Sequence, residues 1–221
     1  MGGGSTAAAV ESSGILAIGN IQVAPAGISG PVKWETQGSE FRYDRPGPNG
    51  TISFVSGHGS PGIVEGGKVQ RHIIHVVMNN LAPHTVAGTL ASLLSNPAIR
   101  VTAPQQITVN GLAATKISTT DTTDELSAVI CKQDWYFDPK TLLPVRVDFL
   151  TSEVHNAIDT AKMSYLFSDW RSVSGVLMPF QVVTLFEGQQ TSVTTFGSIQ
   201  IGVAIPAAEF DVPAAATGGA L

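Results

Sequence analysis

Apolar and polar residues alternate through much of this chain, and this period of two most constrains how it can fold. In the segment Leu143–Phe149 the apolar residues at odd positions are separated by residues such as Arg146 and Asp148. The segments Ala161–Phe167 and Ile199–Val203 repeat the pattern. Successive side chains of a β-strand point to opposite faces, so a period of two gives a strand one apolar face, whereas a helix needs a period of 3.6. The second half of the chain is therefore predicted to form a sheet with one apolar face.

Turn-forming residues separate the predicted strands. Asn49-Gly50 and Asn110-Gly111 are hairpin signals because both residue types tolerate a positive φ. Asp138-Pro139-Lys140-Thr141 places proline where its fixed φ suits a turn. The glycine-rich segment Gly57–Gly67 is predicted to be a loop or a frayed pair of strands, and Pro179 puts its own strand at an edge or a bulge. Further strands are predicted at Ile15–Val23, Val32–Thr36, Phe41–Asp44, Ile52–Val55, Val101–Val109, Leu112–Ser118 and Val176–Phe186. We expect about eleven strands in an antiparallel meander.

One segment, Val76–Ser95, has the period of a helix instead. Val86, Leu90, Leu93 and Leu94 are spaced i, i+4, i+7 and i+8, which places them on one helical face. A sheet of the expected length has to curl or close, and its concave apolar face needs a cover. Because this region is the only cover that the sequence offers, the predicted fold class is mainly β with α (α+β), a curled antiparallel sheet with a helical lid.

Composition favours one folded domain. Of the 221 residues, 43% are hydrophobic and 13% are charged, so the chain has ample material for a core. We expect a single domain over residues 1–221, with a partial or frayed helix at residues 1–12 and a flexible tail at residues 214–221. No segment reaches about 18 consecutive apolar residues, the length of a membrane span. The N-terminus lacks the positive residues of a signal peptide.

The charges argue against a nucleic-acid partner, because the net charge is −5 and no Lys/Arg cluster occurs. One asymmetry stands out: residues 66–120 contain Lys68, Arg71, Arg100 and Lys116 and no acid. This is either chance in a charge-poor chain or a mildly positive lid that faces an anionic lipid or a partner.

The sequence offers no complete catalytic motif. Gly57–Gly62 matches GxGxxG, but Pro61 prevents the helix that a dinucleotide site needs, and no acid follows at the required distance, so a turn is predicted. A hydrolase elbow around Ser60 lacks its first glycine, which is His58 here. We therefore expect no enzymatic activity and no cofactor.

No metal site is predicted either. His72 and His75 are spaced to share a metal on a helix, but a third ligand is missing, so they are expected to be interfacial side chains. The acidic run Asp121–Glu125 lacks the alternating oxygen ligands of a calcium loop and is expected to be solvated. Cys131 is the only cysteine and is predicted to be a small buried side chain on a strand.

Four segments resemble a known family. Trp135–Val147 (WYFDPKTLLPVRV) is similar to the central hairpin of the LolA-like lipoprotein-sorting superfamily. Tyr165–Arg171 (YLFSDWR) and Gly175–Phe180 (GVLMPF) are similar to its next two strands, and Glu209–Pro213 (EFDVP) to its closing segment. The resemblance implies an unclosed β-barrel with a helical lid around an apolar cavity, exported to the periplasm. Carriers of this family shield the acyl chains of lipoproteins without catalysis.

Fold, composition and resemblance lead to one main hypothesis, the binding of a lipid or of lipoprotein acyl chains in an apolar cavity. The partners expected are those acyl chains and a membrane-associated protein, and the chain is expected to be a monomer in the periplasm or another extracytoplasmic compartment. A sensory or structural module that binds a protein partner is the alternative, and a hydrolase with His58 or His155 is a remote one. The residues predicted to line the cavity are Trp34, Val86, Leu90, Leu94, Val145, Val147, Phe149, Met163, Tyr165, Phe167, Met178 and Phe180.

Overall fold

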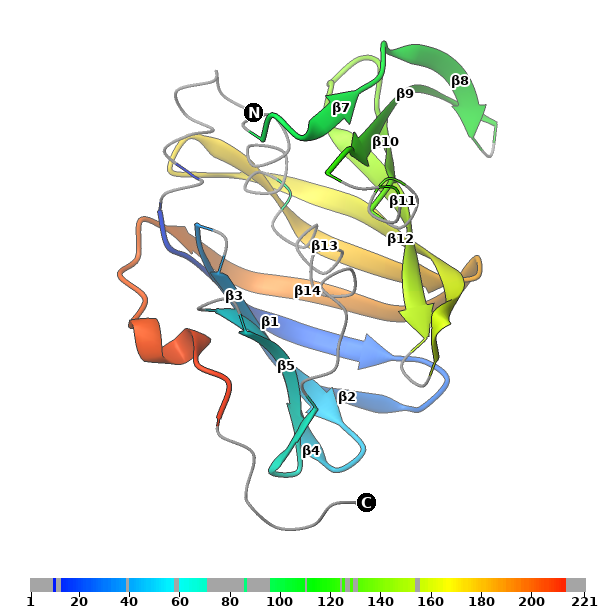
Figure 1. Ribbon diagram of the computed structural model, residues 1–221. Helices are drawn as coiled ribbons and strands as arrows, with labels where there is room; N and C mark the ends of the chain where they lie inside the picture. Colours follow the sequence, from blue (N-terminus) through cyan, green and yellow to red (C-terminus); the bar gives the residue numbers. More distant parts are fainter. Residues whose placement is uncertain are drawn as a thin grey trace.

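The computed structural model describes residues 10, 13–38, 40–57, 60–70, 86, 96–109, 111–123, 125, 128, 131–153 and 156–213. Over these residues the protein is mainly β, with fourteen strands in one sheet and one short 3₁₀ helix (Figure 1). The elements are β1 (Ile15–Val23), β2 (Ile28–Gln37), β3 (Glu40–Gly47), β4 (Gly50–Gly57), β5 (Ser60–Glu65), β6 (Lys68–Gln70), β7 (Ile99–Val101), β8 (Gln105–Val109), β9 (Leu112–Asp121), β10 (Gln133–Phe137), β11 (Pro144–Glu153), β12 (Asn156–Val173), β13 (Val176–Phe186), β14 (Gln189–Ile201) and η2 (Ala207–Phe210).

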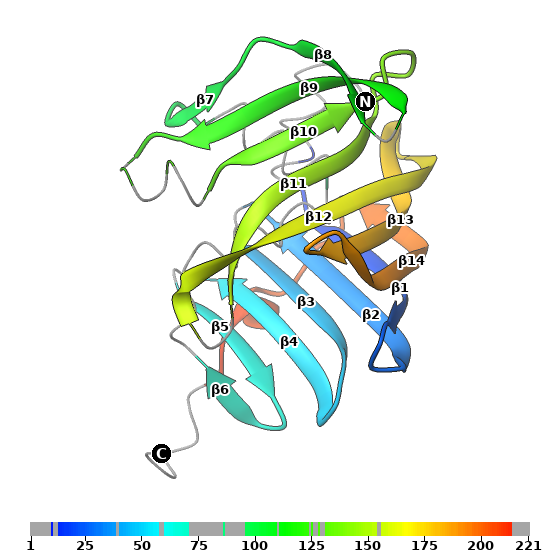
Figure 2. The same ribbon diagram turned by 90° about the vertical axis from the view of Figure 1, so that its right-hand side faces the viewer.

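Every pairing in the sheet is antiparallel, and the strand order is β6-β5-β4-β3-β2-β1-β14-β13-β12-β11-β10-β9-β7, with β8 also paired to β9. β1 pairs with both β2 and β14, so the first and last strands lie side by side in the middle of the sheet (Figure 1). Figure 2 shows the sheet curling, with β9 and β10 above β3 and β4. Among the strands described, β6 and β7 end the order without pairing to each other, so the sheet is unclosed.

The predicted count of about eleven strands is wrong, for two local reasons. The glycine-rich segment forms β5 and reaches the turn before β6, because Gly66 and Gly67 adopt φ values of +55° and +75° that close a tight turn. The expected strand Val101–Val109 is split into β7 and β8 by residues 102–104. Pro104 in this break has no N–H to donate to a ladder.

The predicted hairpins are confirmed, but the turn between β3 and β4 is Pro48-Asn49, because Gly50 belongs to β4 and is paired with Gly47. Asn49 lies between β3 and β4, and Gly111, with φ of +80°, lies between β8 and β9. In the GxGxxG segment Gly57 of β4 is paired with Ser60 of β5. Pro179 lies in an interior strand, but the pairing of β13 with β14 covers only Gln181–Phe186, so this proline is in a stretch paired with β12 alone. A residue without an N–H is tolerated there.

The main hydrophobic cluster lies on the concave face of the curled sheet. It draws buried residues from both halves of the chain, including Trp34 of β2, Trp135 of β10 and Phe196 of β14. Because alternate residues of each strand join it, the opposite residues form a convex face. The sheet is therefore two-sided, with its apolar side turned inward.

The predicted helical lid over Val76–Ser95 lies outside the described residues except for Val86. Val86 is helical, fully buried and part of the concave cluster. The predicted helix at residues 1–12 and tail at residues 214–221 also lie outside them, apart from Val10, which is helical and buried in the same cluster. In the part of the chain that is described, no helix has the length and apolar character needed to cross a membrane.

The segment that follows β14 folds back over the convex face of β2–β4. Phe210 of η2 is 1% exposed, and its backbone and Cβ lie directly over Gly57 of β4. Two ion pairs fix the neighbouring Glu209, whose Oε2 lies 3.1 Å from Nζ of Lys33 and 3.9 Å from Nη1 of Arg42. The closing segment of the chain thus gives the N-terminal half of the sheet a second buried layer.

We predict that Gly57→Ala destabilises the protein. A Cβ at this position would meet the backbone and Cβ of Phe210, and relieving such a clash costs about 1–3 kcal/mol of the free energy of unfolding. Gly197→Ala is the control, because a Cβ there has only the carbonyl oxygen of Ile18 within 4 Å, at 3.9 Å. Urea denaturation of both variants checks this, and equal midpoints would contradict the contact between η2 and β4.

We also predict a pH-dependent contribution from Glu209. The hydrogen bond from Lys33, with the charges of Lys33 and Arg42, lowers the pKa of Glu209 below its ordinary value of 4.5. A lowered folded-state pKa means that the stabilisation is fully present above pH 4.5 and is lost as the pH falls through the folded value. The difference in thermal midpoint between the wild type and Glu209→Gln is therefore expected to be largest near neutral pH and to shrink in acid. A difference that stays constant from pH 7 to about pH 3 would contradict this linkage.

Candidate functional site: the concave face

The N-terminal half of the concave face is an aromatic surface built by β2, β3 and β4. Trp34 stacks on Phe41 with ring centroids 5.6 Å apart and lies 4.9 Å from the ring of Tyr43. Tyr43 continues the surface to Phe54, 6.0 Å away. The register causes this arrangement, since Trp34 is directly opposite Tyr43, which is opposite Phe54, and directly opposed side chains share a face.

The C-terminal half of the concave face is built in the same way by β10–β13. Val147 is paired with Tyr165, and Phe149 with Met163. Phe149 and Tyr165 lie 5.1 Å apart, and Trp135 stacks on Phe167 at 6.2 Å. The prediction that the apolar residues of β11 and β12 face one interior is confirmed for these two pairs.

Most of the residues predicted to line a cavity lie in the concave cluster. Those that are buried there are Trp34, Val86, Val147, Phe149, Tyr165, Phe167, Met178 and Phe180, and Met163 packs against them half-buried. Leu90 and Leu94 lie outside the described residues. The same period of two could have identified Phe41, Tyr43, Trp135, Val182 and Phe196, which were not predicted and are part of the cluster.

Val145 is the exception, and its assignment to the interior is wrong. The ladder between β10 and β11 pairs Tyr136 with Arg146 and then Phe137 with Pro144, so Val145 is the extra residue of a β-bulge. A bulge breaks the alternation of faces. Val145 is consequently 37% exposed, whereas Val147 is fully buried.

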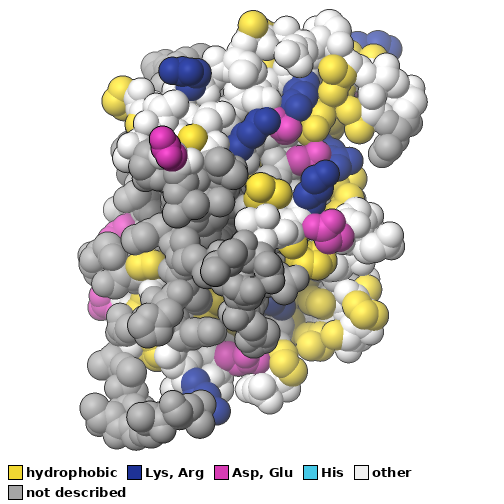
Figure 3. All heavy atoms as spheres, turned by 45° about the vertical axis from the view of Figure 1, so that its right-hand side comes forward, with side chains coloured by type: hydrophobic (Ala, Val, Ile, Leu, Met, Phe, Trp, Pro, Cys, Tyr) yellow, Lys and Arg dark blue, Asp and Glu magenta, His cyan; other side chains and the backbone are white. Residues whose placement is uncertain are grey.

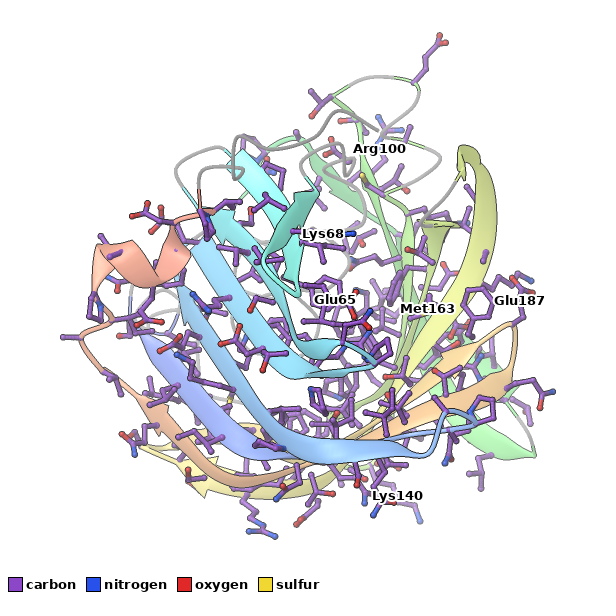
Figure 4. All side chains as sticks on the ribbon, turned by 90° about the horizontal axis from the view of Figure 1, so that it is seen from below. Glu65, Lys68, Arg100, Lys140, Met163 and Glu187 are labelled. Carbon is purple, nitrogen blue, oxygen red and sulfur yellow. The ribbon has the colours of Figure 1, made fainter. Side chains whose placement is uncertain are left out.

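The concave face also carries a small polar group at the end where the β3–β4 and β5–β6 turns lie. Arg45 is opposite Ile52, which is opposite Glu65, which is opposite Lys68, so the four form a row across β3–β6. Figure 4 shows Glu65 and Lys68 pointing to the inner side of the sheet, across from Met163 of β12. The guanidinium carbon of Arg45 lies 5.4 Å from the centroid of the Phe54 ring.

The positive charge of Arg45 affects the pKa values of two buried tyrosines. Burial raises the pKa of Tyr165 well above its ordinary value, and Tyr43 adds to the rise while Arg45 opposes it. Burial likewise raises the pKa of Tyr43, again with Arg45 acting in the opposite direction. Both phenols stay protonated at neutral pH, so the interior between β3 and β12 contains neutral hydroxyl groups near one cation.

The convex face of β9–β12 is polar, and its basic and acidic side chains form ion pairs with one another. Lys116 Nζ lies 2.8 Å from Asp134 Oδ2, and Arg146 pairs with Asp148. Burial raises the pKa of Tyr136, which lies between these pairs, to about 12, with the nearby charge of Asp148 contributing. Figure 3 shows basic and acidic side chains intermixed on this side of the molecule and not gathered by sign. Such a surface does not offer the single-sign field that a nucleic acid requires.

The weaker sequence motifs do not form a site in the described part of the chain. Among the described residues no group of three His, Cys, Asp or Glu side chains is placed to hold a metal. His58, His72, His75 and His155 lie outside those residues. Cys131 is half-buried in the turn before β10, so its assignment to a buried strand position is wrong. Cys131 lies in this turn because β10 begins only at Gln133, two residues further along the chain.

The fold is similar to that of solved structures of other proteins. A domain from Vibrio parahaemolyticus described as an outer membrane lipoprotein-sorting protein has a TM-score of 0.53 and 11% identity, over 91% of this chain and 90% of that one. A DUF1329 family protein from Desulfovibrio piger has a TM-score of 0.53 and 12% identity, over 94% and 92%. A LolA superfamily protein from Nitrosomonas europaea has a TM-score of 0.49 and 11% identity, over 91% of each chain. No protein-family model and no curated protein sequence matches the chain.

The first two likenesses cover nearly the whole of each chain. They show that this chain shares its fold with both proteins, one of which is described as an outer membrane lipoprotein-sorting protein domain. At this level of identity they carry no information on which residues bind a ligand, which has to be argued from the concave face itself.

We predict opposite responses to asparagine at two positions of β11. Val147→Asn places an amide in the buried concave cluster and should lower the free energy of unfolding by about 3 kcal/mol. Val145→Asn changes only the exposed bulge and should stay within about 0.5 kcal/mol of the wild type. Chemical denaturation measures both, and a Val145→Asn variant as unstable as Val147→Asn would contradict the bulge.

Proposed function

We propose that the protein binds a lipid or the acyl chains of a lipoprotein against its concave face, without catalysis. The observation that carries the proposal is the apolar cluster to which both halves of the sheet contribute on one side of an unclosed sheet. Each methylene group removed from water against such a surface contributes about 0.8 kcal/mol. A long acyl chain gains most from this kind of site, because it presents nothing but methylene groups.

The fold supports the class of ligand by analogy. The solved domain from Vibrio parahaemolyticus that shares the fold is described as an outer membrane lipoprotein-sorting protein. Sorting of lipoproteins takes place outside the cytoplasm, so the proposal includes an extracytoplasmic compartment for this chain. Because one fold hosts many functions, the cargo has to be tested directly.

A second candidate function, docking to a protein or membrane partner, is favoured by one specific observation. Leu142 and Leu112 are 68% and 73% exposed, on neighbouring turns at one end of β8–β11. Leu142 has a φ of +57°, a conformation that leucine adopts at a cost, in a turn fixed by Asp138. Exposed apolar side chains are typical of contact surfaces when they form one contiguous patch. This candidate is compatible with a carrier that delivers its ligand.

We predict that Ala17→Leu separates a ligand-binding face from a solid core. Ala17 is buried on the concave side of β1, opposite Trp34. If a ligand occupies this side, the larger side chain should weaken binding of a fluorescent fatty-acid probe and leave the thermal midpoint nearly unchanged. In a solid core it should instead cost about 1–3 kcal/mol through overpacking.

The exposed Ala113 of β9 gives the control Ala113→Leu, which should change neither readout. Native mass spectrometry of the purified wild type should detect bound lipid. A wild type that binds no probe and carries no lipid, with a midpoint that falls on Ala17→Leu, would mean a packed core and no carrier.

A further inference from the structure

Arg45 is a half-buried cation for which the described protein supplies no anion. Of the three half-buried arginines among the described residues, Arg42 pairs with Asp44 and Arg146 with Asp148. No carboxylate of a described residue pairs with Arg45. Its only hydrogen bond in the described part of the chain is a long one, 3.5 Å from Nη1 to the carbonyl oxygen of Pro46. A guanidinium has five N–H donors, so most of them have no partner among the described residues.

Arg45 lies on the concave side of the sheet, beside the apolar cluster. Its guanidinium lies over the Phe54 ring, which packs against the concave cluster, and its charge reaches both buried tyrosines. The cation therefore lies at the margin of the apolar face and not on the convex side, where Arg42 and Arg146 have their partners. Desolvating a charge without a partner is costly, so a bound anion would be favoured there.

Two further charges lie in the same row. The backbone of Glu65 is two strands from Arg45, but its carboxylate reaches back to β3, where Oε1 lies 3.2 Å from the position of a Cβ on Gly47. Lys68 is directly opposite Glu65. The row therefore carries two positive charges and one negative charge. Neither cation forms an ion pair with Glu65 in the described part of the chain, so the row has an excess of one positive charge.

We propose that the ligand of the concave face is an amphiphile with an anionic head, a carboxylate or a phosphate, which the guanidinium of Arg45 binds at this end of the sheet. The inference rests on the proposed function and names its substrate class. A planar guanidinium matches two oxygens of a carboxylate or phosphate with parallel hydrogen bonds. With the head at Arg45, the chain extends along the aromatic surface that begins at Phe54 and Tyr43.

The test compares ligands that share one chain and differ in the head. Oleate, oleyl phosphate and oleyl alcohol displace an uncharged fluorescent probe from the wild type, and the two anions are expected to bind at least about tenfold more tightly than the alcohol, the ratio that one charge-assisted hydrogen bond supplies. Inorganic phosphate alone is expected not to displace the probe. If it binds as tightly as oleyl phosphate, the site takes free anions and the proposal of an amphiphile is wrong.

Variants assign the preference to Arg45. Arg45→Gln should reduce the ratio to about one while leaving the affinity for oleyl alcohol unchanged, and Arg45→Lys should retain part of it, because the charge remains and the bidentate geometry is lost. Glu65→Gln should raise the affinity for oleate, a gain that unfolding cannot produce. Arg42→Gln removes a guanidinium from the opposite face of the same strand and should keep the wild-type ratio.

The outcomes separate this inference from the proposed function. Equal binding of all three oleyl compounds by the wild type, or a preference for anions that persists in Arg45→Gln, overturns the role of Arg45 and leaves lipid binding standing. Absence of binding by any of the three compounds overturns both.

Discussion

The pairing of β1 with β14 is the interaction on which the rest of the structure depends. The ladder runs from Ile15 opposite Ile201 to Val23 opposite Ser192, so it joins the start of the chain to its end. Without it, β1–β6 and β7–β14 would be two separate sheets, each with one more unpaired edge. With it, apolar residues of both halves share one concave face. Contacts of such sequence separation are slow to form, because a long loop has to close before they stabilise anything.

The two faces of the sheet satisfy their charges differently. On the convex face some ion pairs join neighbouring strands or η2, as Lys116 does with Asp134 and Lys33 with Glu209, and others lie within one strand, as Arg42 with Asp44. Pairs of this kind, partly accessible to solvent, contribute little stability but keep the surface neutral. On the concave face Arg45 lies against Phe54 without a carboxylate from a described residue. A fold that pairs its outer charges and leaves an inner one available is suited to a ligand with complementary charge.

Local pattern was a reliable guide to individual strands and turns. The period of two predicted that Val147, Phe149, Met163 and Tyr165 share an interior, and the Asn-Gly signals located two hairpins. It failed where backbone geometry overrides alternation. Val145 is exposed because a bulge inserts one residue into β11, and the glycine-rich segment pairs as β5 because its turns are tight enough to do so. Neither the bulge nor the pairing of β5 alters the amino-acid composition of its segment, so composition could not have predicted them.

By itself, the sequence determined which residues can be strands, where the chain turns, and that one face of the sheet is apolar, because these follow from side-chain periodicity and from the φ preferences of Gly, Asn and Pro. The resemblance of four segments added the family of folds. Only the tertiary structure decided that β1 closes against β14 and that Glu209 and Phe210 cover β2–β4. It also decided that Arg45 faces inward while Arg42, three residues earlier, faces outward and is paired. Periodicity assigns side chains to alternate faces, but it does not say which strands become neighbours or which face the curl encloses, since both depend on contacts between residues far apart in the chain.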